Sequence, residues 1–129
     1  MSATRETDNT LVKPLEGAIV RRYTTGATVE AGEAVYLDGS GYIQPCNGGA
    51  VATNFCIGVA VQDIASGDSG SVVIFGPLLC MSGATPGAII WTADTAGEIS
   101  ESAGTFDTVI GVAETATILF VNPMMKDFA

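Results

Sequence analysis

Short apolar runs separated by turn-forming residues make up most of this chain from Leu11 onward. The clearest runs are rich in β-branched and aromatic residues, and they are Ala34–Leu37, Ser71–Phe75, Ala88–Thr92 and Ala116–Val121. Three are followed directly by Asp, Gly or Asn, and Ala88–Thr92 by Ala93-Asp94, which is typical of strands that end in tight turns. The 16 glycines in 129 residues leave few windows for a stable helix, and the single helix candidate is Gly49–Phe55. The pattern predicts an all-β fold.

The order of these strand-like segments repeats once along the chain. Three pairs of segments correspond: Val35–Asp38 with Ile90–Asp94, Ile57–Ala60 with Ile110–Ala113, and Val73–Pro77 with Leu119–Pro123. A preserved order of elements indicates a duplicated structural unit. We therefore predict an internal repeat of about residues 28–77 and 84–123, whose two similar halves form a small antiparallel β-barrel or sandwich.

The first residues differ in character from the rest. Residues 1–10 are polar, rich in Thr and without hydrophobic periodicity. We predict an extended N-terminal arm at 1–12 and a single β domain at 13–129, a length that suits one domain. No segment has the apolar core of a signal peptide or the length of a membrane span, so we expect a protein made inside a cell without membrane contact.

The bases are confined to the ends of the chain. Its 14 acids and 5 bases give a net charge of −9, and the stretch between Tyr23 and Met125 holds ten acids and no base. Such a charge argues against nucleic-acid binding. Four bases lie within the first 22 residues, namely Arg5, Lys13, Arg21 and Arg22. They either belong to a solvated, locally mixed surface or dock on an acidic neighbour, and the sequence leaves both interpretations open.

Catalytic chemistry has little support. The chain lacks histidine, which excludes Ser–His and Cys–His nucleophiles and His-ligated zinc. Gly67-Asp68-Ser69-Gly70 matches the tetrapeptide around the nucleophile of trypsin-like proteases, but no histidine can activate Ser69. We interpret it as a turn between strands at Val61–Ile64 and Val72–Phe75. The acids lack the spacing of calcium loops, and nothing pairs two of them in a cleft for glycoside hydrolysis. We expect no catalytic residue, cofactor or metal.

Two further groups of residues have packing roles. Cys46, Cys56 and Cys80 form no CxxC pair, and we predict buried, reduced thiols. Tyr36 and Trp91 occupy corresponding positions in the two halves. Aromatic residues dominate both cores and interfaces, so these two are either core residues or interface anchors.

In order, the motifs include the turn Val29-Glu30-Ala31-Gly32-Glu33, the strand Gly41-Tyr42-Ile43, the Ile57–Ala60 segment and the Gly67–Gly70 turn. The second half repeats them as Ala84–Asp94, Gly97–Ile99 and Val109–Glu114. This arrangement resembles the capsid cement, or head decoration, proteins of tailed bacteriophages, over about Lys13 to Val121. The resemblance implies a non-enzymatic virion protein, made in the host cytoplasm, that sits on the outer surface of the phage head. Homotrimers would clamp the lattice of the major capsid protein.

Docking would involve residues 1–22, with Arg5, Lys13, Arg21 and Arg22, and strand pairing with the capsid or a sister copy. Deleting residues 1–12 is then expected to leave a folded domain that fails to bind heads. The alternative is an extracellular carbohydrate-binding or adhesion β module that uses Tyr23, Tyr42 and Trp91 as aromatic platforms.

Overall fold

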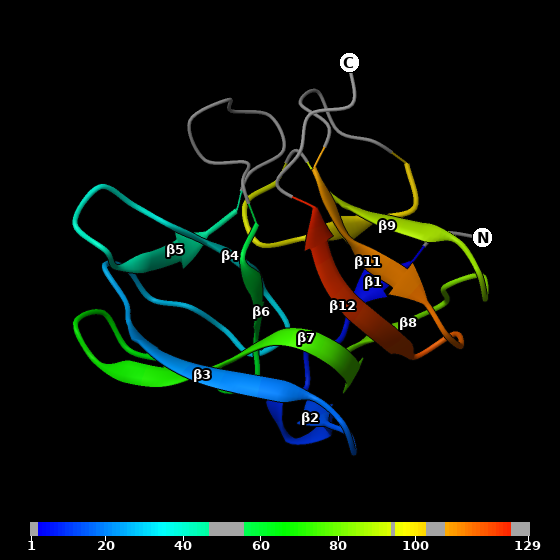
Figure 1. Cartoon of the computed structure of the whole chain (residues 1–129), viewed down its shortest axis with the longest axis horizontal. Coiled ribbons are helices and arrows are strands. Elements are labelled where there is room, and N and C mark those ends of the chain that lie inside the picture. The colour runs from blue at the N-terminus through cyan, green and yellow to red at the C-terminus, as the bar shows by residue number, and fades with distance from the viewer. Residues whose placement is uncertain (1–2, 47–55, 94, 103–107, 125–129) are drawn as a thin grey trace.

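The computed structural model describes residues 3–46, 56–93, 95–102 and 108–124, and the predicted all-β fold is confirmed (Figure 1). The strands are β1 (Thr4–Arg5), β2 (Lys13–Pro14), β3 (Ile19–Thr24), β4 (Ala34–Leu37), β5 (Ile43–Pro45), β6 (Gly58–Ala60), β7 (Ser69–Leu79), β8 (Met81–Ser82), β9 (Ile89–Thr92), β10 (Ile99–Ser100), β11 (Val109–Ala113) and β12 (Ile118–Met124). In these ranges the single helical element is a 3-10 turn, η1 (Asn9–Leu11). The helix candidate at Gly49–Phe55 lies outside the described residues.

Two halves of the main sheet have the same strand order. The sheet runs β10-β9-β11-β12-β7-β6-β4-β5, and every pairing along it is antiparallel. Reading inward from either end gives the same connections, because β5, β4, β6 and β7 correspond to β10, β9, β11 and β12. The sheet curls into a half-barrel (Figure 1), and the pair β1–β8 forms a second, small sheet. The fold is therefore built from two similar halves that meet where β7 pairs with β12.

β7 connects these halves because it is 11 residues long and pairs with four other strands. Its first part pairs with β3 and β6, and its second part with β2 and β12. Val72 and Val73 are paired with both β3 and β6, so these two strands lie on opposite sides of β7. Figure 1 shows β3 running beside β7 along the margin of the sheet.

Two hydrophobic clusters cover the two faces of the sheet where β6 meets β7. Val59 and Val73 belong to the larger cluster, with Leu78, Ile90 and others, whereas the adjacent residues Ala60 and Val72 belong to the smaller one. Successive side chains of a strand point to opposite faces, so neighbours in sequence enter different clusters. The sheet is therefore buried on both sides where β6 meets β7.

The repeated Ile-Gly-Val-Ala segments have the same structural basis in both halves. A Cβ atom at Gly58 would overlap the carbonyl oxygen of Val73, and one at Gly111 would overlap the carbonyl oxygen of Phe120. In each half the glycine lets the paired strand approach more closely than any side chain permits.

The strand expected at Val61–Ile64 differs from the structure, which has β6 at Gly58–Ala60 instead. Ile64 forms a single bridge with Val29, whose backbone N–H and C=O both bond to it. The side chain of Ile64 packs over Gly70, where a Cβ atom would collide with it. The predicted turn then follows at Gly67, which has a φ of +88°, and the chain enters β7 at Ser69.

Candidate functional site

The N-terminal segment lies against the body of the chain. β1 pairs antiparallel with β8, and the backbone N–H of Glu6 donates to the carbonyl of Cys80 at 2.8 Å. Ala3 and Val12 are buried and belong to the larger core cluster. Residues 3–12 thus make core contacts within the chain, and a freely extended arm is not seen here.

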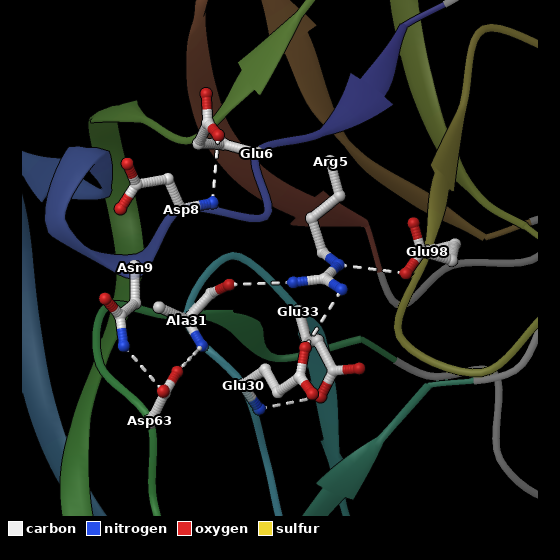
Figure 2. A network of polar contacts seen from close by, with 9 residues as sticks. All are labelled: Arg5, Glu6, Asp8, Asn9, Glu30, Ala31, Glu33, Asp63 and Glu98. Atoms are coloured by element: carbon white, nitrogen blue, oxygen red, sulfur yellow. Dashed lines mark hydrogen bonds and ion pairs between the residues drawn. The ribbon is translucent and has the colours of Figure 1, made fainter.

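Arg5 fastens this segment to both halves of the sheet (Figure 2). Its Nε donates to Glu98 Oε2 at 2.9 Å, its Nη1 to the Ala31 carbonyl at 3.0 Å, and its Nη2 to Glu30 Oε1 at 3.1 Å. Glu30 and Ala31 precede β4, whereas Glu98 precedes β10 in the other half. The Arg5 side chain is only 8% exposed. Within the described residues, these two ion pairs are the only ones.

The charges around Arg5 shift its pKa and that of Glu33. Burial by itself lowers the pKa of Arg5, but the hydrogen bond and charge of Glu98 outweigh it, so the net shift is upward. Burial raises the pKa of Glu33, although a hydrogen bond from the Glu30 N–H at 2.8 Å and the charge of Arg5 oppose this. A Cβ atom at Gly97 would collide with the Glu33 carboxylate, so the glycine leaves the room that this carboxylate occupies. The cluster joins one buried cation to three carboxylates.

A second set of hydrogen bonds holds the segment after β1. Asp63 Oδ1 accepts from the backbone N–H of Ala31 at 2.9 Å, and its Oδ2 accepts from Asn9 Nδ2 at 2.6 Å (Figure 2). These bonds, the one from Ala31 above all, lower the pKa of Asp63. Asp8 caps the 3-10 turn by accepting from the Thr10 N–H at 3.0 Å. The network is structural, because both oxygens of Asp63 and Oδ1 of Asp8 accept from donors within the chain.

The other three bases proposed for docking are exposed. Lys13 lies on β2, and Arg21 and Arg22 lie side by side on β3. Arg22 Nη2 donates to the Ser69 carbonyl at 3.3 Å, and the guanidinium of Arg21 is 5.9 Å from the centroid of the Tyr23 ring. The structure therefore separates the four predicted bases into one that is engaged internally and three that face solvent.

An exposed apolar row crosses five strands of the sheet. Cross-strand pairing joins Ile89 to Val112, Val112 to Phe120, and Phe75 to Ile19, and the Phe75 and Phe120 rings meet edge to face at a centroid distance of 5.1 Å. Four members are 42–52% exposed and Phe120 is half-buried. We call Ile19, Phe75, Phe120, Val112 and Ile89 the outer apolar row. Contiguous exposed apolar surface of this kind marks an interaction site.

Tyr36 and Trp91 have different surroundings despite their corresponding positions in the repeat. Tyr36 packs against the larger core cluster, and burial raises the pKa of its hydroxyl. Trp91 is half-buried and lies two residues after Ile89 on β9, which places it on the face that carries the outer apolar row. Of the two aromatic residues, Trp91 is the one next to a candidate interface.

Ser69 and the three cysteines, which the sequence analysis considered for chemistry, lie among ordinary packing and hydrogen-bonding contacts. The Ser69 hydroxyl lies 3.0 Å from that of Thr24 at the edge of the sheet. The three cysteines are buried and free, as predicted, and burial raises the pKa of Cys80 to about 12. Among the described residues, no three His, Cys, Asp or Glu side chains are placed so that they could hold a metal ion together. A small, mainly apolar hollow of about 150 Å³ is lined by Glu6, Leu11, Leu79, Cys80, Met81 and Thr117.

Exposed bases and an exposed apolar row on a β-sheet are features typical of a surface that contacts another protein. The family model of the phage cement proteins matches residues 20–117, from the start of β3 to the turn before β12. The match covers more than half of the chain, which therefore belongs to the phage cement protein family and is a structural protein of the phage capsid. This confirms the resemblance seen in the sequence. A comparison with curated proteins found no match. In the part of the chain that the structure describes, no helix is long and apolar enough to cross a membrane.

Proposed function

We propose that this protein is a non-enzymatic cement protein that binds the outer surface of the phage head and stabilises the lattice of the major capsid protein. The match to the cement protein family carries this proposal. The outer apolar row supports it, because a row of exposed apolar side chains is costly for a protein that stays alone in water. The buried, free thiols suit synthesis in the reducing cytoplasm of the host.

Docking through the first 22 residues remains our proposal, with a division of roles among the bases. Lys13, Arg21 and Arg22 are available to a partner, whereas Arg5 is engaged with Glu30 and Glu98. Because residues 3–12 make core contacts, deleting residues 1–12 would disturb the fold as well as any docking. Point substitutions at the exposed bases are the cleaner test.

Assembly as a homotrimer on the capsid is a further part of the proposal. Many copies on a lattice gain from avidity, so each individual contact can be weak. Trp91 is the better candidate for an interface anchor, since Tyr36 packs against the core. Light scattering of the free protein and of particles carrying it would determine whether trimers exist in solution or form on the head.

The direct experiment uses phage heads assembled without this protein. Added protein should co-sediment with expanded heads to a saturating copy number, and saturated heads should lose their DNA at a higher temperature than bare heads. The proposal would be contradicted if all added protein stays in the supernatant, even when its concentration is well above that of the major capsid protein subunits in the heads.

A further inference from the structure

Within the parts of the chain that the structure describes, β3 has the longest open strand edge. Among the described residues β3 pairs only with β7, and its six residues are exposed or half-buried. The other ends of the main sheet are β5, which has three residues and contains Pro45, and β10, which has two. Short edge strands and proline are common protections against pairing with another chain. β3 is longer and has no proline, and its protections are the charges of Arg21 and Arg22 and the register shift between Ile19 and Val20. Its backbone can therefore accept a strand that matches these features.

The corresponding edge in the second half is already occupied by an extended segment. By strand register Val73 corresponds to Phe120, because they pair with the equivalent residues Val59 and Val112. On their other side they pair with Val20 and Pro77. The second part of β7 therefore lies beside β12 in the second half, just as β3 lies beside the first part of β7 in the first half. Leu78 and Leu79 pair on their far side with Pro14 and Lys13 of β2. The same far side of β3 has no such partner in the described residues.

The charges on β3 indicate what kind of strand fits. Arg21 and Arg22 are adjacent, so their side chains leave opposite faces of the strand. Neither has a carboxylate within 4 Å among the described residues, although the chain between Tyr23 and Met125 carries ten acids and no base. An incoming strand with acidic residues at neighbouring positions would place one carboxylate on each face, next to a guanidinium.

A second copy of this chain fits this edge poorly. Antiparallel pairing of two β3 strands about their centre would bring Arg21 of one copy opposite Arg22 of the other, and like charges directly opposite are destabilising. The remaining open edges that a copy offers within the described residues, β5 and β10, are too short to match six residues. The occupant is therefore more consistent with an extended segment of a different protein.

The outer apolar row continues from the same edge. Ile19 begins β3 and pairs with Phe75, whose ring contacts Phe120. A segment that pairs with β3 and continues past Ile19 would reach this row, so apolar residues beside the acidic ones would be buried there. Backbone pairing, two charges and an apolar contact would then act together.

We infer that the free edge of β3 binds an extended, acidic segment of the major capsid protein by strand addition, with carboxylates at Arg21 and Arg22. This inference rests on the proposed function and adds the mode of contact and the chemistry of the partner segment. The Arg5 cluster has no part in this contact, because its guanidinium is satisfied within the chain.

The test compares two variants of equal net charge on heads assembled without the cement protein. Arg21→Gln/Arg22→Gln removes two positive charges from β3, and Ser40→Asp/Ser102→Asp adds two negative charges at exposed loop residues. The first variant is expected to bind heads at least about tenfold more weakly than wild type, and the control within about twofold. Hydrogen exchange of wild type should show the amides of residues 19–24 becoming protected when heads are added.

Each result has a defined meaning. Wild-type protein that fails to bind heads at all would overturn the proposed function and this inference with it. Wild-type binding with no new protection in 19–24, or with both variants equally affected, would overturn the inference and leave the proposed function standing. Protection of 19–24 in the protein alone, together with a dimeric mass by light scattering, would assign the edge to a second copy and also overturn it.

Discussion

Arg5 and the pair Arg21–Arg22 are the same type of residue in two opposite situations. Arg5 is 8% exposed and is held by Glu98, Glu30 and the Ala31 carbonyl. Arg21 and Arg22 stand exposed on a strand edge, with only a carbonyl and an aromatic ring nearby. The bases near the N-terminus therefore have different surroundings: Arg5 is held within the fold, whereas Arg21 and Arg22 are exposed, and we propose that these two bind a partner.

The largest expected effect separates these two situations by a matched pair of substitutions. Arg5→Met keeps an aliphatic stem but leaves Glu98 and Glu33 partly buried without their cation, so the free energy of unfolding should fall by about 2 kcal/mol. Arg22→Met should change it by less than about 0.5 kcal/mol, because the side chain is exposed. Urea unfolding followed by Trp91 fluorescence measures both. An equal loss of unfolding free energy in Arg5→Met and Arg22→Met would contradict this distinction between the two arginines.

A smaller effect concerns Glu33, whose pKa is raised in the folded protein mainly by burial. Its protonated form favours folding, so this contribution is complete below the ordinary glutamate pKa and is lost as the pH rises through the raised value. Glu33→Gln mimics the protonated form and retains an oxygen that accepts from the Glu30 N–H. The variant should therefore be more stable than wild type at pH 7, by about 0.5 kcal/mol, and equal to it near pH 3. Urea midpoints of both proteins from pH 3 to pH 7 test this. A difference between variant and wild type that does not change with pH would contradict it.

The smallest expected effect concerns Asp63, whose contribution to stability is lost as the pH falls and not as it rises. The pKa of Asp63 is lowered by the Ala31 N–H and by Asn9, so its contribution is present above the ordinary aspartate pKa and is lost as the pH falls through the lowered value. Asp63→Asn should cost about 0.5 kcal/mol or less at pH 7, since the carboxylate is exposed and screened, and nothing at pH 2. The same urea series detects this, and a loss that persists in acid would show that the amide disturbs packing instead.

Local features of the fold were predictable because neighbouring residues determine them. The run Ala34–Leu37 is β4 as predicted, and the turn after it places Gly41 at a φ of +84°. The repeated Ile-Gly-Val-Ala segment marks equivalent strands in the two halves, where glycine is required by close strand contact. The prediction of a strand at Val61–Ile64 was wrong, because the packing of Ile64 over Gly70 is a tertiary contact that the neighbouring sequence does not indicate.

The candidate site was less predictable because it depends on contacts distant in sequence. Arg5 and Glu98 are 93 positions apart, and nothing near either residue indicates their pairing. The outer apolar row depends on the register of five strands, and the continuous run Ile118–Val121 gives no sign of which residues face outward. Alternation of polar and apolar residues would have provided that sign, but here both faces of β12 are apolar.

The length of β7 has a mechanical consequence for a structural protein of a phage capsid. A load applied along β3 passes into β7 through a ladder of bonds that lie across the direction of pull, and from there into β12 through a second ladder. Bonds loaded in this shear geometry must break together rather than one after another. The molecule would then act as a tie whose strongest direction is the one in which its edge strand is pulled.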